Sequence, residues 1–238
     1  MEEEFRKYVE QFDLNEKSIL LKYYHCLRVK DLCALIAKSE NLSSEDVALS
    51  KIIGLLHDYG RFYQWSEYHT FNDLKSVDHG DFAVERLFIN NEILKFWPNV
   101  KDFDEIFDAI KYHNKLNVPE VLSDHNAKLC RILRDADKLD ILYIWSNAIH
   151  DINETDKDIT DKVKDDFDKE TLVNYENVKT DDDHLIQILS LVYDLNFKYS
   201  FKHLKDYDLV NKLYERLKNK QKYKYYFDKI NDYIERMI

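Results

Sequence analysis

The chain has 238 residues, of which 45% are hydrophobic, but it contains only three glycines and two prolines. A chain so poor in turn-forming residues cannot easily supply the tight turns of a multi-stranded β fold. With 46 acidic against 35 basic residues, its formal net charge is -11. Such an acidic surface repels phosphate backbones, so duplex nucleic acid is excluded as a general partner.

The beginning of the chain and its cysteines favour a cytoplasmic protein. The first residues, Met-Glu-Glu-Glu-Phe-Arg, are acidic and lack the apolar stretch of a signal peptide. No segment approaches the roughly 18 apolar residues of a membrane-spanning helix. Cys26, Cys33 and Cys130 form no CxxC pattern, so we expect buried free thiols and neither a disulfide frame nor a zinc site. We therefore expect a cytoplasmic location and no membrane partner.

Apolar residues recur at helical spacing through the first third of the chain. One helix is predicted from residue 17 to about residue 40. A second begins at the Ser43-Ser44 pair, either member of which can cap it, and runs to His57-Asp58. Residues 61–77 are aromatic and polar without a clear period, so they are predicted to form a long ordered loop.

Helical periodicity continues downstream, and the predicted fold class is all-α. Helices are predicted near 79–90, 102–115 and 124–150, with proline-containing breaks between them. Residues 151–180 are dense in Asp, Lys and Glu, which is typical of a solvated linker or an exposed helix. Helical periodicity then resumes at Leu185, and a second segment carries Leu209, Leu213 and Leu217 at four-residue spacing.

Two regions follow from this pattern. Residues 1–150 are expected to form one helical domain, and residues 151–238 a helical C-terminal extension that packs on the same core. The Tyr-rich, Leu-spaced helices of the extension are more often used to complete a core or a homodimer face than to bind a separate protein. A homodimer is therefore an open expectation.

Three polar residues occupy positions of apolar helix faces. His25 lies four residues after Leu21, and His113 continues the series of Phe103, Ile106 and Ile110. Asp137 falls four residues after a buried-type leucine, where an unpaired carboxylate would be costly unless a cation or hydrogen bonds compensate it.

Three further polar residues stand at predicted helix ends. His57 and Asp58 terminate an apolar helix, and His79 precedes Gly80 at the start of another. A single inward histidine is more often a hydrogen-bonded core residue than a metal ligand. Six such residues in one apolar scaffold fit a shared cation better than separate accidents. Histidine with carboxylate suits manganese, iron, zinc or magnesium, and the absence of thiolates argues against a structural zinc.

The order of these residues resembles that of the HD superfamily of metal-dependent phosphohydrolases. That superfamily is named for an adjacent His-Asp pair, with a histidine upstream and an aspartate downstream. Here the matching segments are His25, residues 55–61 (Leu-Leu-His-Asp-Tyr-Gly-Arg) and residues 134–140 (Arg-Asp-Ala-Asp-Lys-Leu-Asp). The resemblance covers roughly residues 20–145 and implies an HD-domain helical bundle with additional C-terminal helices.

Two more segments are similar to those of dinuclear members. Asp78-His79-Gly80 and residues 109–114 resemble the two histidine elements that supply a second ion. The resemblance implies two divalent ions, with Asp58 as the bridging and catalytic carboxylate, and manganese, iron, magnesium and zinc all remain open. The implied first ion takes His25, His57, Asp58 and Asp137, and the second takes His79 and His113.

The resemblance implies hydrolysis of a nucleotide or another small phosphate ester by a metal-activated water. Arg61 is similar to the basic residue of HD-x-G-[KR] motifs and is a candidate phosphate contact. Further candidates are Lys75 in the predicted loop, Lys138 beside Asp137, and Asn114 after His113. For Arg61, Lys75 and Lys138, the alternative is a solvated or salt-bridged surface cation.

Two other functions stay open at this level. Some HD-fold proteins resembling myo-inositol oxygenase use the same four histidines and two aspartates to hold a mixed-valent di-iron centre, so the ligand set does not separate oxygenase from hydrolase. A non-catalytic sensor of a phosphorylated ligand is the third reading. It is less attractive because a sensor would tolerate loss of some of the six candidate ligands.

Overall fold

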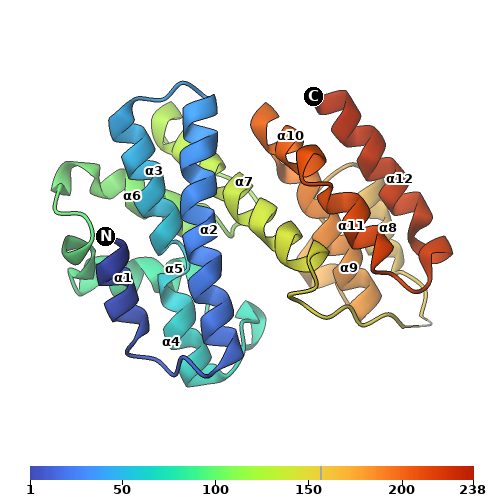
Figure 1. Ribbon diagram of the computed structural model, residues 1–238, viewed down its shortest axis with the longest axis horizontal. Coiled ribbons are helices and arrows are strands. Elements are labelled where there is room, and N and C mark those ends of the chain that lie inside the picture. The colour runs from blue at the N-terminus through green and yellow to red at the C-terminus, as the bar shows by residue number, and fades with distance from the viewer. Residues whose placement is uncertain (156) are drawn as a thin grey trace. The chain divides into compact units, whose positions relative to one another are not determined.

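The computed structural model describes residues 1–155 and 157–238, and the regular elements of this described part are all helical (Figure 1). The predicted all-α fold class is therefore confirmed. The described residues divide into two compact units, Met1–Ala136 and Asp137–Ile238. The division falls inside one uninterrupted helix, α7 (Asp124–Ser146). The predicted boundary at residue 150, and the packing of the extension on one core, stay predictions.

The first unit is built around α2 and α3, which are antiparallel and pack against each other along their lengths (Figure 1). Helix α3 also contacts α6, and α4 and α5 contact each other. The helices of this unit before α7 are α1 (Glu2–Val9), α2 (Lys17–Ser39), α3 (Ser44–Leu56), α4 (Tyr59–Tyr68), α5 (His79–Val84) and α6 (Phe103–Tyr112). Short 3₁₀ helices, η1 (Asp73–Lys75), η3 (Glu92–Lys95) and η4 (Val100–Asp102), lie between them, and a π-helical segment, η2 (Glu85–Ile89), directly follows α5.

Helix α3 starts and packs as its sequence directs. Ser43 is the N-cap, and its hydroxyl accepts a hydrogen bond from the backbone amide of Asp46 at 3.0 Å. Gly54 lies where α3 approaches α2, and a Cβ atom there would lie 2.8 Å from Cys33 Sγ and 3.0 Å from Lys30 Cα. Glycine thus permits the close packing of α3 against α2. This packing brings His57, at the end of α3, near His25 of α2.

The predicted loop over residues 61–77 is wrong in its first half. Residues 59–68 form α4, which ends at His69 in the left-handed conformation with φ of 51°. The helix buries Phe62 and also the polar side chain of Gln64. Its buried face therefore lacks the continuous apolar spacing from which a helix is predicted. The remaining segment, up to Asp78, is irregular apart from η1 and agrees with the prediction.

The second unit contains the rest of α7 and a set of shorter helices. They are α8 (Asp161–Asp168), α9 (Asp181–Ser190), α10 (Lys198–Asp206), α11 (Leu209–Glu215) and α12 (Lys220–Met237), with turns η5 (Tyr175–Asn177) and η6 (Leu191–Asp194). Helix α12 contacts α9, α10 and α11, and α8 packs on α9.

Residues 151–180 are less exposed than their composition predicts. Helix α8 buries Val163 and Phe167 completely. Buried carboxylates of α9 anchor the preceding segment: Asp182 accepts hydrogen bonds from the amide and hydroxyl of Thr155, and Asp183 from those of Thr160. Acidic residues here satisfy backbone donors, a use that charge density alone does not reveal.

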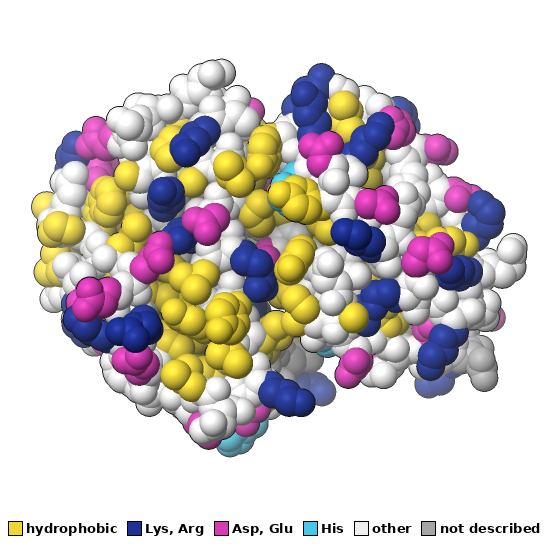
Figure 2. All heavy atoms as spheres, viewed as in Figure 1, with side chains coloured by type: hydrophobic (Ala, Val, Ile, Leu, Met, Phe, Trp, Pro, Cys, Tyr) yellow, Lys and Arg dark blue, Asp and Glu magenta, His cyan; other side chains and the backbone are white. Residues whose placement is uncertain are grey.

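The surface carries both signs of charge. Acidic and basic side chains are interspersed on the face shown in Figure 2, with hydrophobic side chains between them. None of the described helices combines the length and the hydropathy needed to cross a membrane.

Candidate metal centre

The six predicted metal ligands are presented by helices, and four of them stand at helix ends. A residue at a helix end is held by a rigid element without being covered by the next turn. They are His25 within α2, His57 directly after α3, Asp58 directly before α4, His79 at the first position of α5, His113 directly after α6, and Asp137 within α7.

Asp58 lies between two pairs of histidines. Its Oδ2 atom is 3.4 Å from Nε2 of His25 and 3.5 Å from Nε2 of His57, and these two nitrogens are 3.2 Å apart. Its Oδ1 atom is 3.8 Å from Nε2 of His79, which in turn lies 3.0 Å from Nε2 of His113. The two oxygens of one carboxylate therefore face different histidine pairs.

The six residues form three overlapping groups, within each of which the ligand atoms lie within 4.8 Å of one another. Asp137, the residue after Ala136 in the same helix, groups with His57 and His113. The implied division of ligands between two ions stays a prediction. The groups are His25, His57 and Asp58; His57, His113 and Asp137; and Asp58, His79 and His113.

In three of the histidines, the hydrogen bond made by Nδ1 determines whether Nε2, which faces the centre, carries a proton. His57 Nδ1 donates to the carbonyl of Gly54 at 2.8 Å, and His113 Nδ1 donates to that of Ile110 at 2.6 Å. Because a carbonyl can only accept, Nδ1 carries the proton, and a neutral ring then directs the Nε2 lone pair inward. His79 is oriented likewise, since its Nδ1 lies 2.5 Å from Asp73 Oδ2.

This arrangement fits a metal ion. The Nε2 lone pairs of His79 and His113 face each other at 3.0 Å, which is repulsive unless a proton or a cation lies between them. Histidine with its outer N–H bound to a carbonyl or a carboxylate is the usual form of a metal-ligating ring. The buried Asp58 supplies the negative charge that a cation requires.

The charge state of the centre follows from its cations. Burial alone would raise the pKa of Asp58, but the Lys22 ammonium and, less strongly, the Arg61 guanidinium hold that pKa well below its usual value. Burial lowers the pKa of His79, helped by Arg61 and opposed by Asp73 and Asp58. An ionised Asp58 beside a neutral His79 is the protonation state that metal binding needs.

Two residues that contact the centre, Lys22 and Asp73, were not predicted from sequence. Lys22 Nζ lies 2.6 Å from Asp58 Oδ2. Asp73 Oδ1 accepts from Arg61 Nη1 at 2.7 Å while its Oδ2 bonds His79, so one carboxylate positions both residues. Lys22 could have been found from its place one helical turn before His25, and Asp73 from the rule that a ligand histidine has an outer partner.

Arg61 and Lys138, predicted phosphate contacts, have intramolecular partners. Arg61 Nη1 donates at 2.7 Å to each of Gln64 Oε1, the carbonyl of Phe71 and Asp73. Lys138 is buried and forms an ion pair of 2.9 Å with Asp194. Each residue thus has a structural role, and contact with substrate stays a prediction for both.

Lys75 and Asn114, the other predicted substrate contacts, differ in burial. Lys75 is exposed at the end of η1. Asn114 Nδ2 donates to Asp78 Oδ1 at 3.0 Å, whereas its buried Oδ1 has no hydrogen-bond partner. A Cβ at Gly80 would lie 2.6 Å from that oxygen, so glycine lets the amide approach α5 beside His79. Substrate contact stays a prediction here as well.

The model of the HD domain family matches residues 23–142. This range covers half of the 238 residues and includes all six predicted ligands. The chain belongs to the HD domain family. The resemblance predicted from the His-Asp pair is therefore confirmed, and with it a place in a superfamily of metal-dependent hydrolases whose domains bind divalent metals. Searches of curated proteins and of solved structures gave no match.

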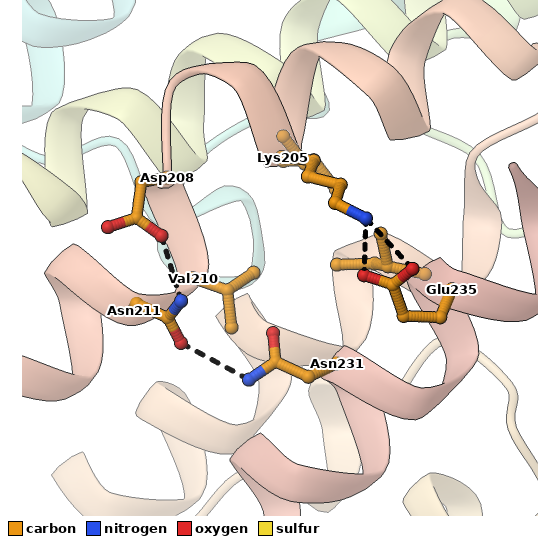
Figure 3. A pocket seen from close by; sticks show the side chains of 8 residues that line it. Lys205, Asp208, Val210, Asn211, Asn231 and Glu235 are labelled. Carbon is orange, nitrogen blue, oxygen red and sulfur yellow. Dashed lines mark hydrogen bonds and ion pairs between the residues drawn. The ribbon is translucent and has the colours of Figure 1, made fainter.

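A surface pocket of about 270 Å³ lies within the second unit, between α10, α11 and α12 (Figure 3). Its polar side chains are paired with one another. Lys205 bonds both oxygens of Glu235 at 2.7 and 2.8 Å, Asn211 donates to Asp208 at 2.8 Å, and Asn231 donates to Asn211 at 3.2 Å. No predicted metal or substrate residue lines it.

The N-cap of α5 makes the region around His79 sensitive to acid. Burial would raise the pKa of Asp78, but Lys115, Asn114 and the amide of Asp81 lower it to about 2 from its usual 3.8. A depressed carboxyl pKa stabilises the fold above the unfolded-state value, and this stabilisation is lost as the pH falls from about 4 toward 2.

We therefore expect Asp78→Asn to remove part of the acid dependence of stability. The free energy of unfolding, measured by urea titration between pH 2 and pH 7, should fall less steeply in the variant than in the natural chain. Asp104→Asn, at an exposed position in α6, is the matched control and should leave the slope unchanged. If the free energy of unfolding fell equally steeply with pH in Asp78→Asn and in the natural chain, the lowered pKa of Asp78 would not account for the acid dependence.

Proposed function

We propose that this HD domain is a metal-dependent phosphohydrolase that acts on a nucleotide or another small phosphate ester. The observation that carries the proposal is the buried Asp58 carboxylate, whose two oxygens face two separate histidine pairs. A carboxylate placed in this way suits a bridge between two divalent ions.

The six residues would hold the ions with nitrogen and oxygen atoms alone. Four imidazoles and two carboxylates without a thiolate suit manganese, iron or zinc, and magnesium less well because it prefers oxygen ligands. When bound, such ions supply Lewis acidity and lower the pKa of water, which is the chemistry that phosphate ester hydrolysis needs.

The side chains around the ligands prepare the centre for this role. Asp58 stays ionised because Lys22 and Arg61 lie beside it, so both of its oxygens can act as ligands. Asp73 holds the ring of His79 in the tautomer that directs Nε2 inward, and Arg61 in turn holds Asp73. Gln64, fully buried, donates to Asp73 at 3.1 Å and completes this support.

The test is hydrolysis by gently purified protein of known metal content. The chain should carry two ions and release phosphate from some member of a panel of nucleotides, sugar phosphates and a generic phosphate ester with added manganese. Release should stop on chelation and return on adding metal. No release across the panel from protein with two ions bound would refute the proposal. Substrate-dependent oxygen uptake by the iron-loaded protein would instead support the oxygenase alternative.

A further inference from the structure

Lys22 contacts the bridging carboxylate from α2. It lies one helical turn before His25, so both side chains project from the same face of that helix. Its Nζ atom is 2.6 Å from Asp58 Oδ2 and 5.4 Å from the centre of the Phe71 ring. The ammonium is thus fixed at the metal centre by a hydrogen bond and by the face of an aromatic ring.

The ammonium keeps donors for a further partner. A lysine has three N–H donors, and among the described residues Asp58 is the acceptor that the structure gives to Lys22. The side chain of Lys22 is 17% exposed, whereas that of Asp58 is 2% exposed. The lysine is therefore the accessible member of the pair, and an anion that approaches Asp58 from solvent meets the ammonium.

Two of the three predicted cations, Arg61 and Lys138, have intramolecular partners. Arg61 Nη1 already serves three acceptors, and Lys138 is paired with Asp194. Lys75 is exposed at the end of η1. Arg61 Nε also lies 3.5 Å from Asp58 Oδ1, but this atom is buried. Of the four, Lys22 is the cation that forms a hydrogen bond with the central carboxylate from a partly exposed side chain.

We propose that Lys22 binds the phosphate group of the substrate, donating from its ammonium to a non-bridging phosphate oxygen beside Asp58. The inference rests on the proposed function and adds to it the residue that recognises the anion. Lysine suits this task as a compact point charge with rotatable donors. A lysine that served only to neutralise the buried Asp58 would need no accessible donor.

Binding of inorganic phosphate to the manganese-loaded chain tests this without turnover. Lys22→Met should keep the manganese stoichiometry of the natural chain but bind phosphate roughly 10- to 100-fold more weakly in calorimetric titration, as expected for loss of a charged hydrogen bond. Lys22→Arg should recover part of the affinity. Lys38→Met, at an exposed position of the same helix, is the matched control and should bind phosphate normally.

Amine labelling of the natural chain gives a second readout that does not depend on a variant folding. Phosphate should protect Lys22 of the manganese-loaded protein from acetylation, as followed by mass spectrometry, and should leave Lys38 unprotected. The proposal is overturned if Lys22→Met binds phosphate as tightly as the natural chain does. It is also overturned if phosphate leaves the acetylation of Lys22 unchanged. Because neither readout requires catalysis, a chain that binds phosphate through Lys22 yet hydrolyses no ester would refute the proposed function alone.

Discussion

Asp58→Asn is expected to abolish phosphate ester hydrolysis, with a loss on the order of 10³-fold or more. The carboxylate is buried, and its two oxygens lie 3.4 to 3.8 Å from the Nε2 atoms of His25, His57 and His79. An amide has the same shape but no charge and only one oxygen acceptor, so it cannot bridge two cations. Metal analysis of the purified variant should show fewer than two ions per chain.

The control for this change is Asp104→Asn, which alters the charge by the same amount at an exposed site of α6. Its metal content and rate should match those of the natural chain. Circular dichroism should show that the Asp58→Asn chain is folded. Its stability should be lower than that of the natural chain, because Lys22 loses its anionic partner. Two ions per chain and an unchanged rate in Asp58→Asn would contradict the bridging role.

Helical spacing identifies three of the six predicted ligands, His25, His113 and Asp137, as polar residues on apolar helix faces. His25 and Asp137 were singled out because each interrupts an apolar face, and a polar side chain there must meet another polar group or an ion inside the fold. The structure places these residues in three overlapping groups of potential ligands. Metal binding by the groups stays a prediction, because spacing gives the direction of a side chain and not what it binds.

The residues that support the ligands could not be found in this way. Asp73 begins the short helix η1 in a segment whose sequence has no period, and its approach to His79 and Arg61 follows the end of α4 at a left-handed His69. Gln64 faces inward from α4 although it is polar, which also hid that helix within a predicted loop. Hydrophobic periodicity fails where a polar network replaces apolar packing, and functional sites are where this happens.

Loss of one of two ions is expected when His79 and His113 are both replaced by alanine. Their Nε2 atoms lie 3.0 Å apart, and they form one potential ligand group with Asp58, while His25 and His57 form another with the same aspartate. Removing the first pair should leave the second pair with Asp58, so metal analysis should fall from two ions to one per chain. Hydrolysis that needs both ions should fall by at least roughly 100-fold.

His125→Ala is the control, since it removes an exposed histidine from the same unit. It should keep two ions and full activity. One ion in the natural chain, unaffected by the His79 and His113 changes, would contradict a dinuclear centre and leave a mononuclear one. Loss of both ions in the double variant would show instead that the two positions are coupled through Asp58, because an ion at one position then orients the carboxylate for the other.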